Sequence, residues 1–464
     1  MSFLLSPDIN NNKVFLVKHC ELEGRLDPFC YIPELVKLDK KIKSKTDYRL
    51  KDFSIFRASG ATPSKSHDEY YSDKENGIPF IRVQNLSTTG ELNQSDLIYI
   101  SKDIHEGLLK RSQVKEHDLL VKITGVGRMA VASVVPDGFV GNINQHIVVV
   151  RTGSKEISEN IATFLNLDAV ENIATKRATG GTRPALDYPA LFSIPVINDR
   201  NIYNKVNKSV AAKKKKEAEA QQLLSSIDEY LLAELGIKQS EAVENTLQSR
   251  MFTRQLKEVF GGRLDPNTYR YERMSAIKSI KDSSYPVKPL SQIVEFKTDK
   301  TNHIDEQEKY IGLENVESNT GEWVSSKSKE SISSASIFNS DDILFPKLRP
   351  YLNKVFHSDC IGLCSTEFHV LNSHTENNSY IANFLRSKVV ISQTENLMSG
   401  NTLPRLQFED IQKLLVPVPP PEKQLEMVRH IASIRTQAKR LRLQAKKELE
   451  QAKKAVEVMI LGEA

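Results

Sequence analysis

Cysteine is scarce in this sequence. Its four cysteines are Cys20, Cys30, Cys360 and Cys364, too few for a secreted chain of 464 residues that relies on disulfide bridges. Cys360 and Cys364 are one residue too far apart for a CxxC pair, and no second Cys or His pair stands at zinc-finger spacing. We therefore expect four core cysteines and no metal site.

Targeting signals and long apolar runs are also missing. The first residues lack a basic segment, and their apolar run is far too short for a signal peptide or a membrane helix. The 64 Lys and Arg against 59 Asp and Glu leave a net charge of +5, which permits a polyanionic partner without requiring one. We expect a cytoplasmic protein of roughly three domains.

Catalytic signatures are absent as well. The sequence has no GxxxxGK[ST] phosphate loop, no HExxH, no GxSxG and no Asn/Asp-Pro-Pro-Tyr/Phe loop of adenine methyltransferases. Residues 125–127 begin a GxG pattern, but Ala130 stands where a dinucleotide loop has its third glycine, so we interpret the segment as a turn. His146 and His369 lie in strand-like runs and are expected to be structural. The sequence thus predicts no catalytic residue.

An internal repeat dominates what is present. Gly-Arg-Leu-Asp-Pro occurs twice, and four further matches follow it in the same order at a similar offset. Matches that keep one order over the whole chain indicate an internal duplication. The five matched pairs are 24–28 with 262–266, 80–86 with 310–316, 118–121 with 342–345, 141–150 with 362–371, and 181–186 with 401–406.

Each copy ends in a long helical segment. Residues 204–235 contain no Gly or Pro and stop at Gly236, and residues 421–461 stop at Gly462, as helix C-termini commonly do. Apolar residues step by three or four along both segments, which is typical of a coiled-coil stripe. The stripes are Val206, Val210, Ala220, Leu224, Ile227, Leu231 and Leu235, and Ile431, Ile434, Ala438, Leu441, Ala445, Leu449, Ala452, Val456 and Met459.

The region before each helix has a mixed α/β pattern. Runs rich in β-branched residues and bounded by Gly, Pro and Asn predict strands, and two segments near 161–174 and 380–396 predict short helices. We predict an α+β protein: two mixed α/β globules, each followed by a long helix, with the two helices pairing as an antiparallel coiled coil. A helix of about 35 residues spans roughly 50 Å. The predicted strands cover 78–86, 118–123, 129–135 and 146–151.

The chain resembles the specificity subunit of type I restriction-modification systems over nearly its whole length. The motifs that carry this resemblance are the repeated Gly-Arg-Leu-Asp-Pro, Ile-Arg-Val-Gln-Asn at 81–85, Ile-Gly-Leu-Glu-Asn at 311–315 and the proline-rich segment 417–424. The first copy departs from the pattern, because 194–198 lacks the Pro-Pro-x-x-Gln ending. The resemblance implies target recognition domains at 1–200 and 238–418, and conserved helices at 201–237 and 419–464.

The resemblance also implies a function. Each target recognition domain reads one half of a split, asymmetric sequence in double-stranded DNA, and the helices hold the two domains apart. The expected partners are two modification subunits, which transfer a methyl group to adenine, and restriction subunits, which translocate and cut DNA. S-adenosylmethionine, ATP and Mg are expected in those partners, and this chain itself binds no cofactor.

Candidate DNA contacts are polar residues in loops beside predicted strands. Lys and Arg suit phosphates and guanine, whereas Asn and Gln suit adenine. Any one of them could instead be simply solvated, and the 180–184 segment could be a structural turn. The candidates are Lys122, Thr124, Arg128, Asn144, Gln145, Arg177, Thr179, Thr182 and Arg183 in the first copy, and Lys347, Arg349, Tyr351, Asn353, Lys354, Thr366, Asn401, Thr402 and Arg405 in the second.

Two other functions remain open. A coiled-coil adaptor that binds only proteins would have no salt-dependent affinity for DNA. A DNA-modifying enzyme would transfer a methyl group or cut DNA without partners, and the missing motifs weigh against it. The DNA sequence recognised and its spacer length do not follow from the residues.

Overall fold

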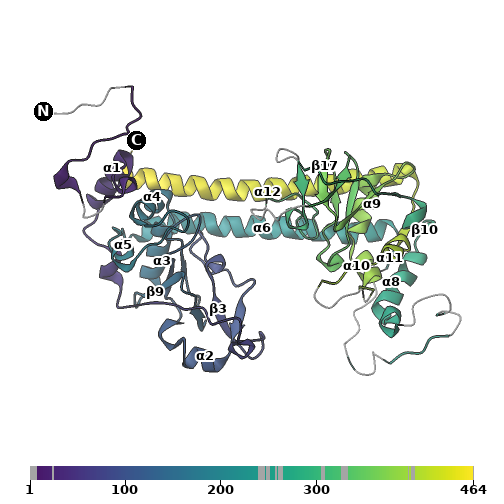
Figure 1. The fold of residues 1–464 in the computed structure, drawn as a ribbon, viewed down its shortest axis with the longest axis horizontal. Coiled ribbons are helices and arrows are strands. Elements are labelled where there is room, and N and C mark those ends of the chain that lie inside the picture. Colours follow the sequence, from purple (N-terminus) through teal and green to yellow (C-terminus); the bar gives the residue numbers. More distant parts are fainter. Residues whose placement is uncertain are drawn as a thin grey trace. The chain divides into compact units, whose positions relative to one another are not determined.

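Two compact units make up the chain. The computed structural model describes residues 8–22, 26–238, 246, 251–255, 259, 265–304, 309–325, 333–395, 397–398 and 403–462. Unit 1 combines Met1–Glu217 with Arg442–Ala464, and unit 2 is Ala218–Leu441. The two long helices, α6 (Arg200–Glu234) and α12 (Pro421–Leu461), therefore contribute one part each to both units (Figure 1). No described helix is both long and apolar enough to cross a membrane.

Unit 1 contains two sheets, with strand orders β1-β9-β6-β7 and β2-β4-β3-β8-β5. The alternation along β9 explains their packing, because Val148 and Val150 face the helices while Ile147 and Val149 face the core shared with the second sheet. The elements are β1 (Phe56–Ser59), β2 (Tyr71–Ser72), β3 (Ile78–Ile81), β4 (Ile98–Ile100), β5 (Gln113–Val114), β6 (Leu119–Lys122), β7 (Ala132–Val134), β8 (Gly141–Ile143), β9 (Ile147–Arg151), α1 (Pro33–Lys43), α2 (Lys102–Glu106), α3 (Lys155–Leu165), α4 (Asp168–Arg177) and α5 (Tyr188–Phe192).

Unit 2 repeats the four-stranded sheet of unit 1, whereas its second sheet has four described strands where unit 1 has five. Its strand orders are β11-β18-β15-β16 and β12-β14-β17-β13, and a short pair, β10-β19, is added. The parallel pair β3-β8 of unit 1 corresponds to the parallel pair β13-β17. The elements are β10 (Val287–Pro289), β11 (Glu295–Lys297), β12 (Lys300–Thr301), β13 (Tyr310–Ile311), β14 (Ala335–Phe338), β15 (Ile343–Pro346), β16 (Phe356–His357), β17 (Gly362–Ser365), β18 (Phe368–Asn372), β19 (Leu415–Pro417), α8 (Tyr271–Lys281), α9 (Asn378–Leu385), α10 (Lys388–Thr394) and α11 (Phe408–Gln412).

The repeated turns and carboxylates have the same structural roles in both units. Asp27 and Asp265 each accept a backbone N–H from two residues further on and so begin short 3₁₀ helices at Pro28–Tyr31 and Pro266–Tyr269. Asp118 is buried against the guanidinium of Arg151, at 2.7 Å. Its counterpart Asp342 is buried against Lys297, also at 2.7 Å. The fold thus keeps each carboxylate while the cation comes from a different strand.

The segments near 161–174 and 380–396 are helical as expected, and each consists of two short helices. α3 ends at Leu165 and α4 begins at Asp168. The buried amide of Asn166 explains the break, because its oxygen accepts the N–H of Ala132 at 3.1 Å and its nitrogen donates to the carbonyl of the same residue at 2.7 Å. A side chain that satisfies a strand end in this way fixes the helix terminus.

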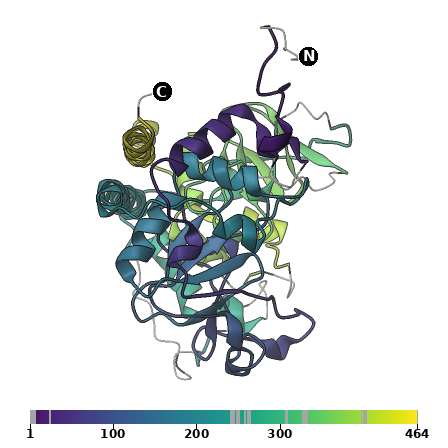
Figure 2. The same cartoon turned by 90° about the vertical axis from the view of Figure 1, so that its left-hand side faces the viewer.

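Inside each unit the two long helices run antiparallel and pack on each other. In unit 1 Lys216 pairs with Glu448 at 2.5 Å, and Lys205 lies 3.1 Å from the sulfur of Met459. In unit 2 Lys423 pairs with Glu234 at 2.6 Å. Figure 2 shows the two helices end-on. The predicted stripe holds except at Met459, which is 44% exposed because Ile460, next to it, turns into the core instead.

The helix stripes belong to the same cores as the globules. Val206 and Val456 lie in the apolar cluster that contains β6 and β9, and Leu231 and Ile431 lie in the cluster that contains β15 and β18. Burying one such side chain stabilises a protein by about 1.5–3 kcal/mol. Each globule therefore cannot be separated from its helices without opening its core.

A basic side chain of α12 fixes the Thr-Gly-Glu turn of each unit. Lys453 donates from Nζ to the carbonyl of Thr88 at 2.7 Å, next to the Thr89-Gly90-Glu91 turn. Arg435 donates to the carbonyl of Thr320 in the equivalent turn of unit 2. Burial lowers the pKa of Lys453 to about 8, so its ammonium is held in a poorly solvated place. The two contacts show that the repeat includes the way each globule attaches to α12.

The cysteines are not all in the core. Cys30 and Cys364 are buried, and Cys30 donates from Sγ to the carbonyl of Lys176 at 3.1 Å. Cys360 is partly exposed and Cys20 is exposed, so the expectation of four core cysteines was wrong for these two. All four are free thiols.

Three aromatic rings pack together at one edge of unit 2. Phe296 on β11 lies 5.0 Å from Phe408 on α11, and His369 on β18 lies 5.3 Å from Phe408, measured between ring centroids. Burial, together with the nearby Lys347, lowers the pKa of His369 to about 4. The imidazole is thus neutral at pH 7 and has the structural role expected for it.

This histidine predicts an acid-sensitive unit. Unfolded His369 has a pKa of about 6.5, so below that pH the unfolded chain binds a proton that the folded chain refuses, and stability falls as the pH drops toward 4. Between pH 7.5 and pH 5 we expect the free energy of unfolding to fall by about 1 kcal/mol after discounting for partial exposure, measured by urea titration at the two pH values. His369→Phe should reduce the loss, whereas the exposed control His374→Gln should not; an unchanged loss in His369→Phe would contradict this.

Candidate nucleic-acid interface

The first predicted cluster forms a turn that closes on itself. Lys122, at the end of β6, is buried and donates from Nζ to the carbonyl of Val126 at 2.9 Å. Burial lowers its pKa, although Glu171 opposes the shift. Thr124 hydrogen bonds to the ring of His146, which is therefore structural as expected. Both side chains are used inside the turn, and the prediction that they contact DNA stays untested.

Arg128 is directed at α4. Its guanidinium pairs with the carboxylate of Asp168, lies 3.1 Å from that of Glu171, and donates to the carbonyl of Asn166 at 2.7 Å. These three acceptors hold the turn against the helix. The same guanidinium would have to leave some of them to meet a phosphate or a base.

Asn144 and Gln145 are neighbours with different surroundings. Asn144 is buried, and its side-chain oxygen accepts the N–H of His146 at 3.2 Å. Gln145 is exposed and its side-chain oxygen accepts from the hydroxyl of Thr62. Glutamine offers a donor and an acceptor side by side, which is the pattern that adenine matches in the major groove. Of the two, only Gln145 is exposed to solvent.

The glycine loop that follows α4 is a narrow hairpin. Thr179 and Ala185 exchange backbone hydrogen bonds of 2.8 and 2.7 Å, and Gly180 adopts a positive φ of 97° at the turn. Three predicted residues, Thr179, Thr182 and Arg183, are exposed on it. The segment is therefore a structural turn whose tip displays polar side chains.

Arg177, at the base of this hairpin, is bound internally. It donates to Asp39 at 2.9 Å and to the hydroxyl of Ser193 at 3.2 Å. Burial would raise the pKa of Asp39, but Arg177 and Lys43 outweigh it and hold that pKa below its ordinary value. The ion pair ties α4 to α1, which is a fold-supporting role.

The corresponding loops of unit 2 are brought together in the same way. In unit 1 Gly125 donates its N–H to the carbonyl of Pro184 at 3.1 Å, and in unit 2 Arg349 donates its N–H to the carbonyl of Pro404 at 2.9 Å. In unit 1 the bond joins the turn after β6 to the loop before α5, and in unit 2 it joins the turn after β15 to the loop before α11. The alignment of the two predicted clusters is thus matched by their backbone contacts.

This equivalence puts Arg349 where the first copy has a glycine. Gly125 has a φ of 109°, and Arg349 has a φ of 48°, in the left-handed region that favours glycine. The side chain of Arg349 is exposed, and exposed Tyr351 follows two residues later. A non-glycine residue keeps this backbone conformation only where the surrounding structure holds it there. Among the predicted residues of unit 2, Arg349 and Tyr351 have exposed side chains.

Four other predicted residues of unit 2 make internal bonds. Lys347 donates to the carbonyl of Thr366 at 2.7 Å, and burial lowers its pKa. Asn353 is buried and donates to the carbonyl of Arg386 at 2.7 Å, and Lys354 donates to the carbonyl of Leu313 at 2.8 Å. Arg405 forms a two-point pair with Glu367 at 3.0 and 2.7 Å. Asn401 and Thr402 lie outside the described residues.

A basic pocket in unit 1 was missed by the sequence analysis. It is lined by Arg49, Lys51, Arg57, Tyr188 and Phe192, together with Pro189 and Ser193. Its residues come from three separate segments, so no local motif marks it. Only a comparison of the two copies position by position would have drawn attention to it.

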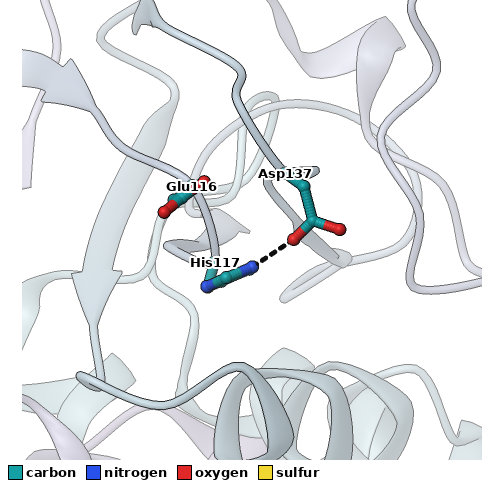
Figure 3. Close-up of side chains that lie close together, drawn as sticks. All are labelled: Glu116, His117 and Asp137. Atoms are coloured by element: carbon teal, nitrogen blue, oxygen red, sulfur yellow. Dashed lines mark hydrogen bonds and ion pairs between the residues drawn. The ribbon is translucent and has the colours of Figure 1, made fainter.

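One group of potential metal ligands is present among the described residues: Glu116, His117 and Asp137, whose ligand atoms lie within 4.8 Å of one another. Figure 3 shows His117 and Asp137 pointing toward each other, with Glu116 beside them. Asp137 also binds the ammonium of Lys155 at 2.8 and 2.7 Å through its two oxygens, and Glu116 accepts the N–H of Gly138 at 3.0 Å. Lys155 already balances the carboxylate, and we assign the group as an ion-pair cluster.

Comparison with known proteins finds a family model that matches part of this chain. Residues 283–451 match the family model of the type I restriction modification DNA specificity domain. The chain is 28% identical over 97 residues to the type I restriction enzyme EcoDI specificity subunit of Escherichia coli. That alignment covers 21% of this chain and 22% of the length of the relative.

Solved structures align over greater lengths but weakly. A chain from a study of complex assembly and conformational transition of the type I R-M system aligns at a TM-score of 0.41 and 14% identity, over 89% of this chain and 95% of that chain. The HsdS subunit from Thermoanaerobacter tengcongensis aligns at 0.33 and 12% identity, over 90% and 96%. The S subunit from M. genitalium aligns at 0.33 and 12%, over 89% and 94%. At these scores the alignments do not establish a common fold.

The left-handed backbone of Arg349 allows the effect of a substitution on stability to be measured separately from its effect on binding. Arg349→Gly and Arg349→Ala both remove the guanidinium, but only glycine relieves a backbone cost of roughly 1–2 kcal/mol. Glycine loses more chain entropy on folding, which offsets part of this gain. We therefore expect the free energy of unfolding of the Gly variant to exceed that of the Ala variant by about 1 kcal/mol, measured by urea titration. If Arg349 contacts DNA as the sequence predicts, the two variants should lose DNA affinity equally. A Gly variant less stable than the Ala variant would contradict the assignment.

Proposed function

We propose that this chain, whose residues 283–451 belong to the type I restriction modification DNA specificity domains, is the DNA-reading subunit of a type I restriction-modification complex. It reads a bipartite, asymmetric target in double-stranded DNA, one half with each unit. It performs no catalysis itself. The observation that carries this proposal is that the sheet β1-β9-β6-β7, which lies outside the matched residues 283–451, has the same strand order as the sheet β11-β18-β15-β16 inside them.

The repeat supports two readers rather than one. The antiparallel register of β6 on β9, with Leu119 opposite Val150, has its equivalent in β15 on β18, with Ile343 opposite Leu371. A shared register means that the loops after these strands leave the two sheets at equivalent places. Two frames that differ in their loop residues suit two different half-sites, as an asymmetric target requires.

The exposed loop residues have the chemistry of DNA contacts. Gln145, Thr182 and Arg183 in unit 1, and Arg349 and Tyr351 in unit 2, are exposed on loops that the backbone brings together. Arg suits phosphates and guanine, and the amide of Gln suits adenine. The internally bonded candidates would then hold the loops in position, and the exposed ones would make the contacts.

The partners follow from the same plan. Each unit contains one part of α6 and one part of α12, so each unit offers a comparable helical surface, which suits two copies of one modification subunit. We propose that these subunits bind S-adenosylmethionine and methylate adenine, and that restriction subunits use ATP and Mg to translocate and cut DNA. The assembly would act in the cytoplasm. The lack of catalytic motifs in this sequence fits that division of labour.

A domain exchange tests this proposal. Replacing residues 20–198 with the equivalent domain of a relative of different specificity should change one half of the methylated target and leave the other half and the spacer intact. The reason is that each half-site is read by loops of one unit. The measurement is sequencing of methylated adenines in DNA from cells that express the hybrid with the modification subunit.

The matched control replaces residues 238–418 and should change only the other half. A hybrid in which both halves change would contradict the assignment of one half-site to each unit. Normal methylation of the original target by either hybrid would show that the exchanged unit does not read DNA.

A further inference from the structure

The basic pocket of unit 1 is a cavity of about 390 Å³ between β1, α5 and the segment 49–53. Three cations line it, Arg49, Lys51 and Arg57, and none of its lining residues is acidic. Two aromatic residues, Tyr188 and Phe192, complete the wall. A concave surface with three positive charges, no lining carboxylate and two aromatic rings suits a phosphate-bearing ligand.

The backbone holds these side chains in place. Leu50 is fully buried and donates its N–H to the carbonyl of Ile194 at 3.0 Å, which fixes the positions of Arg49 and Lys51 on either side of it. Arg57 stands on the edge strand β1, with its guanidinium 4.5 Å from the ring centroid of Phe192. A guanidinium stacked on a ring has lost part of its freedom and can present its N–H groups to an anion at a smaller entropic cost.

The cations of the pocket have no carboxylate partner among the described residues, unlike three other arginines of the chain. Arg128, Arg177 and Arg405 each bind a carboxylate. In the described part of the chain, no carboxylate lies within ion-pair distance of Arg49, Lys51 or Arg57; the carboxylate of Asp52 accepts the backbone N–H of residue 49 instead. The hydroxyl of Tyr188 is buried and has no described protein partner.

The second copy shows that the fold does not need these cations. Leu290 donates to the carbonyl of Leu414 as Leu50 does to that of Ile194, which makes Pro289 and Ser291 the counterparts of Arg49 and Lys51. Phe296 lies opposite Leu371, as Arg57 lies opposite Val150, and Val150 and Leu371 pair with the equivalent residues of β6 and β15. Unit 2 thus has Pro, Ser and Phe at the three positions and fills the place with its aromatic cluster.

We propose that the pocket of unit 1 binds backbone phosphates of the DNA, and this inference rests on the proposed function. α5 directly follows the hairpin that carries exposed Thr182 and Arg183, so a phosphate held beside Tyr188 is close along the chain to a predicted base-reading loop. Phosphate contacts set the position of a protein on DNA, and base contacts set the sequence read. The pocket would anchor the first half-site, and unit 2 would bind its half-site without such an anchor.

The test uses the full chain assembled with its modification subunits. The triple variant Arg49→Gln, Lys51→Ser, Arg57→Phe takes two of its three residues from unit 2. The probe is duplex DNA that contains the target found by methylation sequencing. Anisotropy titrations at several salt concentrations give the association constant K and the slope of log K against log[salt]. Each phosphate contact contributes about 0.9 to that slope, so the variant should lower it by about 2 to 3. Its target sequence should not change.

A matched control removes three exposed lysines of unit 1 that do not line the pocket, Lys41→Ala, Lys65→Ala and Lys74→Ala. This variant loses the same charge and should keep most of the slope. Thermal unfolding of both variants, compared with the original chain, checks that they are folded. An equal loss of slope in both variants would overturn the pocket assignment and leave only a general charge effect.

The remaining outcomes separate the two proposals. If the original chain has no sequence-specific affinity for DNA, the proposed function fails and this inference fails with it. If the original chain binds specifically and the triple variant keeps its salt slope, only the pocket assignment fails. Saturable binding of ATP by the original chain that the triple variant loses, with an unchanged DNA slope, would overturn the assignment in favour of a free nucleotide.

Discussion

The packing of α6 on α12 inside each unit is the interaction on which the rest of the structure depends. In unit 1 Val206 and Val456 belong to the apolar core that also contains the central sheet, and in unit 2 Leu231 and Ile431 do the same. The helices are therefore one wall of each globule. The contacts of Lys453 with Thr88 and of Arg435 with Thr320 attach α12 to each globule at equivalent turns.

Under the proposed function, a repeated frame with different loop residues would let one plan read two half-sites. The frame is kept where it bears on folding, as in the buried Asp118 and Asp342. It changes in the loops and on the edge strand: Gly125 corresponds to the exposed Arg349, and the exposed Arg57 corresponds to the partly buried Phe296.

Sequence patterns could predict the frame but not most of the site. The duplication, the long helices and their stripes follow from periodicity, which survives because packing demands it. The burial of the candidate residues depends on long-range tertiary contacts. Lys122 and Asn353 looked like surface residues in polar loops but are buried, and the break between α3 and α4 depends on the distant backbone of Ala132. The cations of the pocket come from segments that meet only in the folded chain, so spacing could not reveal them.

The proposed function is that this chain selects the DNA sequence at which a methyltransferase acts. The most direct measurement is single-molecule sequencing of methylated adenines in DNA from cells that contain the modification subunit, with and without this chain. We predict a split motif with two unequal halves that appears only when the chain is present. Active modification subunits with no new methylated motif in the presence of the chain would contradict it and favour a protein-binding adaptor.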